Sequence, residues 1–167
     1  MQGLGREFDL GIGLIPYDTN AGAGTGKRVS LQRAQSIAFV LFKGAGTGTD
    51  NPVLTLQEHN AASGGTSQNL AKITTVYKKA GAPGVGTEAW AVALTQAAAA
   101  TATLTGEATN SGIYVFELDG TSLSDGFTHV SLDVADTGAA GAQLGGVLYV
   151  LHGLAVQRKP TNLAATL

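Results

Sequence analysis

The sequence contains no cysteine, which excludes disulfide bridges and thiolate metal ligands. Charged residues make up only 13% of the 167 residues, well below the quarter typical of globular proteins. The net charge of −2 excludes the basic balance typical of nucleic-acid-binding proteins. No stretch approaches the roughly 20 apolar residues of a membrane-spanning helix. We therefore expect neither nucleic acid nor a membrane among the partners of this chain.

Small and apolar residues dominate what is present. The apolar fraction is 44%, although aromatic residues contribute only 6%, and the sequence has 24 glycines. Such a chain is too apolar to be disordered and long enough to form one domain with its own core. A surface with few charges and many small side chains suits packing against other proteins.

A glycine-rich loop, GAGTGTD, separates two apolar runs in residues 39–59, FVLFKGAGTGTDNPVLTLQEH. A phosphate-binding loop would need a P-loop or dinucleotide-binding spacing followed by a helix. Gly44, Gly46 and Gly48 match neither spacing, and residues 53–58 alternate with a period of two, which predicts a strand. We therefore expect a β-hairpin in which residues 53–58 pair with residues 36–42.

A second glycine-rich stretch, AGAGTGKRVS, covers residues 21–30. Ala21 stands where a P-loop needs its first glycine, and Arg28 stands where it needs Ser or Thr. We interpret this stretch as a surface loop.

Strand-like runs recur along the chain, separated by turn residues at intervals typical of sandwiches and barrels. The alternation predicts about eight strands, and the one helical candidate is the short stretch 29–36. We expect an all-β fold, an antiparallel β-sandwich with the jelly roll as the candidate topology. The predicted strand-like runs are 36–42 (central in its sheet), 53–58, 71–77, 88–95, 97–105 (extended), 112–118, 127–134 and 146–152.

Residues 88–95, EAWAVALT, alternate large and small side chains. This alternation predicts that Trp90, Val92 and Leu94 point into the core, with alanines on the other face.

The predicted organisation has three parts. Residues 1–28 form an N-terminal arm or edge segment, because Gly11 and Gly13 interrupt the alternation that begins at Phe8. Residues 29–158 form the β-sandwich domain, and residues 159–167 form a C-terminal tail. The first residues, MQGLGREFDLG, lack a basic region followed by an apolar stretch, so we expect no signal peptide.

The three histidines, His59, His129 and His152, do not form any local metal-ligand pair. We interpret them as surface or strand-end residues. The basic pairs Lys78-Lys79 and Arg158-Lys159 are interpreted as solvated strand ends.

The carboxylates do not form a recognisable catalytic motif. Glu117 and Asp119 should share one strand face, as should Asp133 with His129 and Ser131. The DTG tripeptide at 136–138 lacks the apolar frame of an aspartic protease, and no G-x-S-x-G elbow occurs. We therefore assign no catalytic, cofactor-binding or metal-binding residue and expect a protein that is not an enzyme and needs no cofactor.

Several stretches of the chain carry a resemblance to a known family. They are residues 39–65, FVLFKGAGTGTDNPVLTLQEHNAASGG, then ITTVYKKAG and TEAW, and residues 113–160, IYVFELDGTSLSDGFTHVSLDVADTGAAGAQLGGVLYVLHGLAVQRKP. From about residue 8 to residue 160 the chain resembles small virion structural proteins of tailed bacteriophages.

This resemblance implies a decoration or cement protein that is made in the host cytoplasm and binds the outer capsid surface of a bacteriophage head. It implies the major capsid protein as partner and a homo-oligomer, often a trimer. The arms of such a protein gain from many repeated contacts, which can be individually weak. Two alternatives remain: a carbohydrate-binding β-sandwich module, which would need exposed aromatics on one face, and a structural protein of the tail or neck.

Overall fold

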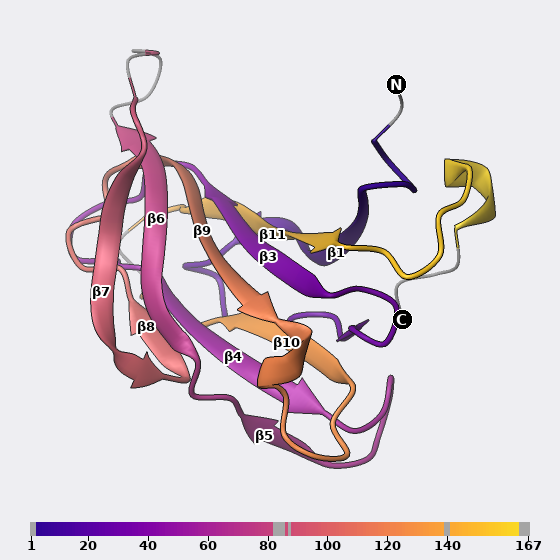
Figure 1. The fold of residues 1–167 in the computed structure, drawn as a ribbon. Helices are drawn as coiled ribbons and strands as arrows, with labels where there is room; N and C mark the ends of the chain where they lie inside the picture. The colour runs from indigo at the N-terminus through magenta and orange to yellow at the C-terminus, as the bar shows by residue number, and fades with distance from the viewer. Residues whose placement is uncertain (1–2, 82–85, 87, 139–140, 164–167) are drawn as a thin grey trace.

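The computed structural model describes residues 3–81, 86, 88–138 and 141–163, and its described part is a two-layer antiparallel β-sandwich (Figure 1). The first sheet has six strands in the spatial order β1 (Phe8–Asp18), β11 (Leu144–His152), β3 (Ser36–Lys43), β9 (Ser111–Asp119), β6 (Ile73–Gly81) and β7 (Ala91–Ala99). The second has β2 (Val29–Ser30), β10 (His129–Val134), β4 (Val53–His59) and β5 (Ser67–Asn69), with β8 (Thr101–Thr103) also paired to β4.

The chain crosses repeatedly from one sheet to the other. Strands β1, β3, β9 and β11 lie in the six-stranded sheet, and the strands that alternate with them, β2, β4, β8 and β10, lie in the five-stranded sheet. With β1 paired to β11 and β2 paired to β10, this is the strand order of a jelly roll. Strands β5, β6 and β7 are an insertion between β4 and β8. The prediction of an all-β sandwich is confirmed, with eleven strands among the described residues in place of about eight.

The predicted hairpin around the loop 44–50 is wrong. Strand β3 lies third in the six-stranded sheet, between β11 and β9, whereas β4 lies in the other sheet and pairs with β10. The loop therefore crosses between the layers. Gly46 allows the crossing, because a Cβ at this position would lie 2.4 Å from the Nε2 atom of the buried Gln143. The central position predicted for residues 36–42 is confirmed.

Two further stretches were tested by the structure. The helix predicted for residues 29–36 is wrong, since this stretch contains β2 followed by a turn. The extended conformation predicted for residues 97–105 is confirmed by the end of β7 and by β8.

Short 3-10 helices occur at Gly120–Ser122 and Pro160–Asn162. Among the described residues, no helix reaches the length and apolar character needed to cross a lipid bilayer.

The terminal parts differ in structure. Residues 8–18 form β1, an edge strand of the six-stranded sheet, in register with β11. The stretch that follows lies along β10, where Gly24 forms an isolated bridge with Val134. Gly26 approaches the backbone of Leu132 so closely that a Cβ there would lie 2.3 Å from its carbonyl oxygen. The glycines of this second loop thus allow it to pack onto β10. Residues 160–163 continue beyond β11 as the second 3-10 helix and its cap.

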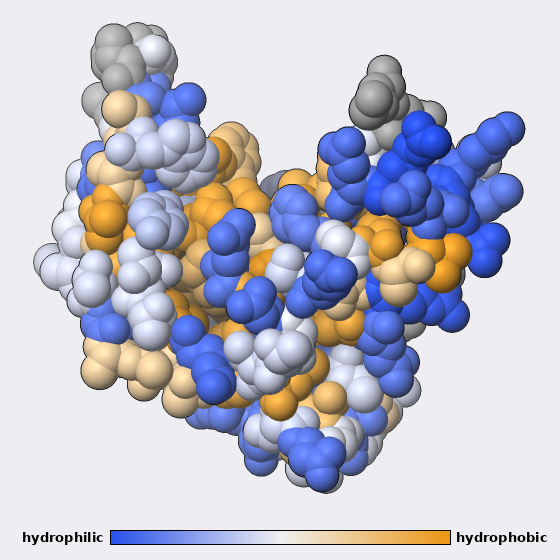
Figure 2. Space-filling view, viewed as in Figure 1, coloured by the Kyte–Doolittle hydropathy of each residue, from blue (hydrophilic) through white to orange (hydrophobic). Residues whose placement is uncertain are grey.

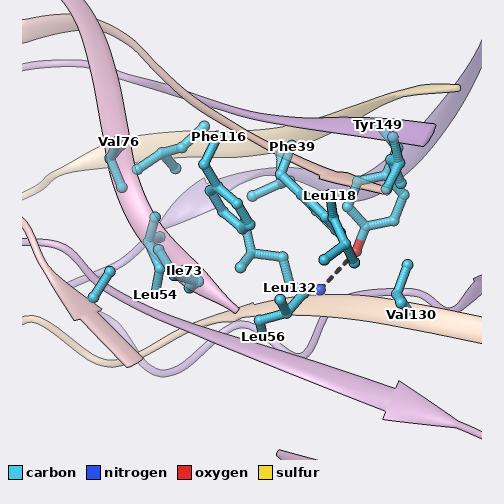
Figure 3. Packing of buried hydrophobic residues seen from close by; sticks show 14 of the residues in the cluster. Phe39, Leu54, Leu56, Ile73, Val76, Phe116, Leu118, Val130, Leu132 and Tyr149 are labelled. Carbon is cyan, nitrogen blue, oxygen red and sulfur yellow. Dashed lines mark hydrogen bonds between the residues drawn. The ribbon is translucent and has the colours of Figure 1, made fainter. Parts of the chain in front are cut away.

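The core lies between the two sheets and is centred on three aromatic rings (Figure 3). Phe39 stacks on Phe116 with centroids 4.7 Å apart, and the ring of Tyr149 meets Phe39 edge-on at 5.3 Å. The Tyr149 hydroxyl accepts a hydrogen bond from the backbone N–H of Leu132 and donates one to the carbonyl of Lys27, both at 3.0 Å. This side chain therefore links both sheets to the segment before β2.

Candidate binding surface

The outer face of the six-stranded sheet is unusually apolar for a face that points away from the core. Strand alternation sends Phe39, Tyr149 and Phe116 inward, so their neighbours point outward. We define the apolar face as the outward side chains Leu10, Ile12, Val40, Phe42, Tyr77, Trp90, Val92, Ile113, Val115, Leu144, Leu148 and Val150.

One row of this face runs across all six strands. The pairings in register are Ile12 with Leu148, Leu148 with Val40, Val40 with Val115, Val115 with Tyr77, and Tyr77 with Val92. Each pair is directly opposite, so the side chains contact one another in succession. Val40 and Val115 in the middle of the row are half-buried. Figure 2 looks onto this face and shows apolar residues gathered over β9 and β3, between the β6–β7 hairpin and the segments near the chain ends.

The exposed aromatic residues belong to this face. Phe42 is 65% exposed, Trp90 57% and Tyr77 51%. Eight of the ten large apolar residues found exposed in the described part of the chain lie here, the others being Ile15 and Val156. Their exposure is therefore concentrated rather than scattered, as it is at interaction sites.

The prediction that Trp90 and Val92 point into the core is wrong. Val92 pairs with Tyr77, and the next pair is Leu94 with Val76, so Ala93 is an extra residue on β7. This β-bulge reverses the alternation and turns Leu94 toward the core, where it packs on buried residues, while Val92 points outward. Trp90, one residue before β7 begins, is exposed together with Val92.

A lysine and a glutamate lie on opposite sides of the row of six residues that runs from Ile12 to Val92. Lys79 follows Tyr77 by two residues on β6 and is paired with Ile113. Glu117 follows Val115 by two residues on β9, and because the two strands are antiparallel it lies on the opposite side of the row. Both side chains are exposed, and neither forms an ion pair with a residue that the structure describes. The predicted shared face of Glu117 and Asp119 is consistent with the exposure of both.

The outer face of the five-stranded sheet carries polar side chains. We define the polar face as Ser30, Thr55, Gln57, His59, Ser67, Asn69, His129, Ser131 and Asp133, which are joined by the pairings of β2, β10, β4 and β5. The prediction that Asp133 shares a face with His129 and Ser131 is confirmed.

His59 and His129 form a cross-strand pair on this face and are only 3% and 8% exposed. All three histidines lie at strand ends as predicted; His59 and His129 are buried there, whereas His152 is exposed. The His59 ring contacts Ser67 Oγ at 2.7 Å through Nδ1 and Ser131 Oγ at 2.9 Å through Nε2. Burial, reinforced by the charge of Arg28, lowers the pKa of His59 to about 4 and also lowers that of His129. Both rings are neutral at neutral pH.

Arg28 holds in place the loop between β4 and β5, which covers the histidine pair. Its guanidinium donates hydrogen bonds to the carbonyls of Ala61 (2.9 Å) and Gly64 (2.6 Å) and to Ser67 Oγ (3.0 Å). The loop between β4 and β5 is thereby held to the segment before β2. Ser131 lies beneath this cover at 1% exposure, where a substrate could not reach it.

Another polar cluster lies at one end of the sandwich, around Lys43 and Glu107. Lys43 is 2% exposed, and its ammonium group donates to the carbonyls of Gly44 and Glu107 at 3.0 and 2.9 Å. Burial lowers the pKa of Lys43 to about 8. Lys43 therefore acts as a clamp on the backbone around residues 107–110.

The Glu107 carboxylate binds Lys78 through one oxygen and accepts hydrogen bonds from Asn110 and the Tyr114 hydroxyl, both at 2.9 Å, through the other. Burial alone would raise the pKa of Glu107, but these three donors outweigh it and lower the pKa. Lys78 is therefore engaged, not a solvated strand end as predicted, whereas Lys79 is exposed.

Glu58 is a further buried carboxylate with a structural role. It accepts hydrogen bonds from Gln68 Nε2 at 2.6 Å and from the backbone N–H of Ser124 at 2.9 Å. Burial opposes ionisation, yet these bonds and the charge of Lys72 lower the pKa of Glu58 overall. Glu58 thus fastens the turn between β9 and β10 to the five-stranded sheet.

The remaining candidates do not converge on one site. Arg158 and Lys159 lie after β11 and line an open hollow with Arg6 and Gln157. In the DTG tripeptide, Asp136 accepts a hydrogen bond from the N–H of Gly138 at 2.9 Å, which is a local turn. Within the described ranges, no three His, Cys, Asp or Glu side chains come close enough together to hold a metal ion. Among the described buried side chains, every nitrogen and oxygen atom has a hydrogen-bond partner.

Comparison with known proteins gives no match to a protein family, a curated protein or a solved structure. The apolar face holds most of the large apolar side chains that are exposed in the described part of the chain. Its sequence signal was present in residues 36–42, SIAFVLF, where residues at both even and odd positions are apolar. Such a run indicates a strand covered on both faces.

Proposed function

We propose that this chain is a non-catalytic structural protein of a virion, a decoration protein that binds the outer surface of a bacteriophage capsid and stabilises the shell. The observation that carries the proposal is the apolar face, a sheet surface that nothing in the described part of the chain covers. A surface of this kind is typical of proteins that work by contact with other proteins.

The polar groups support the same function. The buried ionisable side chains all form hydrogen bonds to other groups of the same chain. They are Lys43, Glu58, His59 and Glu107. Nucleophiles and bases of an enzyme need access to a substrate within hydrogen-bonding reach. Polar clusters whose hydrogen bonds are all made within the chain suit a structural protein. The proposed partner of this protein is the major capsid protein.

The test uses empty shells assembled from the major capsid protein of the same phage without this chain. Purified chain added to such shells should co-sediment to a saturating ratio and raise the temperature at which the shells rupture. Shells of an unrelated phage serve as the control. Absence of binding at micromolar concentration would remove the capsid assignment, and density for the chain on the tail or neck in a particle map would move it there.

A second candidate, a carbohydrate-binding module, is favoured by one observation. Phe42, Tyr77 and Trp90 are exposed on one sheet face, as aromatic platforms for sugar rings would be. However, Phe42 is paired with Ile113 and Tyr77 with Val115, both aliphatic, and a sugar site also needs polar groups that fix the hydroxyls. A glycan-array signal that Trp90→Ala abolishes would favour this candidate over the capsid.

A further inference from the structure

We propose that the apolar face is a self-association surface, on which a second copy of the chain packs sheet against sheet about a twofold axis that runs along the row from Ile12 to Val92. In this dimer the apolar face is taken up by contact between copies, so a decoration protein of this kind would bind the shell through another surface. The dimer itself does not rest on the capsid assignment.

The size of the face fits one half of a stable dimer interface. Leu10, Ile12, Phe42, Tyr77, Trp90, Val92, Leu144 and Leu148 are between 39% and 65% exposed. With roughly 200 Å² of surface for a large side chain, they present on the order of 800 Å² of apolar area. Each partner in a standard interface contributes about that area. A sheet-on-sheet contact would cover it in one step, with the layers about 10 Å apart.

The charges at the edges of the row fit a copy of the same face. Lys79 and Glu117 each lie two residues from the row, on opposite sides, which is about 7 Å along the strands. A twofold axis along the row exchanges these two sides. Lys79 of one copy then lies over the side of the other copy that carries Glu117, and the second Lys79–Glu117 pair forms by symmetry.

This self-complementarity identifies the occupant. In a twofold interface the same patch serves both copies, so its charges must match themselves after the rotation. An unrelated partner imposes no such match. A trimer, in contrast, would need two different surfaces on each copy, and a single face packed against itself is complete with two copies.

The experiment measures the mass and dissociation constant of the full chain by sedimentation. Wild-type protein should form a dimer of the 16.8 kDa chain in a concentration-dependent manner. Lys79→Glu and Glu117→Lys should each weaken the dimer about tenfold, because each places like charges opposite each other at two symmetric positions. The double variant Lys79→Glu/Glu117→Lys should recover wild-type affinity to within about threefold.

Matched controls carry the same charge changes away from the face. Arg33→Glu and Asp125→Lys alter exposed residues outside the six-stranded sheet and should leave the dimer unchanged. Circular dichroism of each variant confirms that it is folded. A wild-type chain that stays monomeric at high micromolar concentration, that forms a trimer, or whose double variant is weaker than either single variant would overturn the inference. None of these outcomes depends on shell binding, so failure here is distinct from failure of the capsid assignment.

Discussion

On the polar face of the sandwich, His59 lies beneath a loop that Arg28 holds in place, and on the apolar face Phe42 is 65% exposed. On the polar face the side chains of His59, His129 and Ser131 are buried, whereas large apolar side chains of the apolar face are exposed. Intramolecular contacts account for the polar face: Ser67, Ser131 and the loop carbonyls provide its hydrogen-bond partners. No described part of the chain plays this role for the apolar face.

This difference separates what stabilises the fold from what is left for binding. A covered polar group without a partner costs about 1–3 kcal/mol, so the polar face must be complete in the isolated chain. An exposed apolar group costs little in the monomer but contributes roughly 25 cal/mol for each Å² that a partner covers. We expect substitutions on the polar face to change the free energy of unfolding, and substitutions on the apolar face to change association.

The largest predicted effect contrasts two phenylalanines of β3 that point to opposite sides. Phe39→Ala removes the ring packed between Phe116 and Tyr149 and should lower the free energy of unfolding by about 3–5 kcal/mol. Phe42→Ala, three residues away on the exposed side, should lower it by less than about 0.5 kcal/mol at concentrations where the chain is monomeric. Urea unfolding measures both, and similar losses for the two variants would contradict the assignment of the faces.

The next effect concerns pH and the polar face. Because burial lowers the pKa of His59 to about 4, from an ordinary value of 6.5, the unfolded chain takes up a proton in this interval while the folded chain does not. The stability that the neutral ring contributes is therefore complete above pH 6.5 and is lost as the pH falls toward 4, by on the order of 3 kcal/mol.

His59→Gln should flatten the slope of unfolding free energy between pH 6.5 and pH 5, and His152→Gln, at an exposed position, should not. Glu58 and Glu107 have lowered pKa values, so their contributions are lost only below their ordinary value of 4.5. The histidine interval is thus separable from theirs. An unchanged slope in His59→Gln would show that the ring is already charged or solvated in the folded protein.

A smaller effect is expected when the Arg28 side chain, which holds the loop between β4 and β5 over His59, is removed. Arg28→Ala deletes three hydrogen bonds to the loop and should lower the free energy of unfolding by about 1–2 kcal/mol. It should also raise the pKa of His59, since the Arg28 charge helps to lower it. Titration of the His59 ring by NMR measures this shift. The control Arg33→Ala changes an exposed arginine and should leave both quantities as they are.

The sequence predicted those parts of the fold that depend on local alternation. The central position of strand β3 follows from the near-continuous apolar run SIAFVLF, and the extended conformation of residues 97–105 follows from the threonines that interrupt the alanines. The hairpin at residues 44–50 was wrong because a flexible loop with strands on both sides looks the same whether it returns to its own sheet or crosses to the other. Which of these occurs depends on contacts with β10, about 75 residues further along the chain.

The surface sites depended on contacts that a local pattern does not contain. Ala93 reverses the alternation of β7 because it is unpaired opposite β6, and no feature of EAWAVALT marks it as a bulge. His59 is buried beneath a loop that Arg28 holds through hydrogen bonds to residues 33 to 39 positions further along the chain. The apolar face, in contrast, was partly predictable, since apolar residues at both odd and even positions of β3 require a cover on both sides.

The smallest predicted effect on folding separates the apolar face from ordinary exposed apolar residues. Val92 is 53% exposed in the row of six, and Val156 is 50% exposed beyond β11. Valine to threonine keeps the shape and adds a hydroxyl, so both Val92→Thr and Val156→Thr should change the unfolding free energy of the monomer by less than about 0.5 kcal/mol. Because only Val92 lies on the face that we assign to self-association, only its variant should reduce the rise of the thermal midpoint with protein concentration. Scanning calorimetry over a hundredfold concentration range measures that rise, and equal behaviour of the two variants would mean that exposure alone, and not position on the row, governs association.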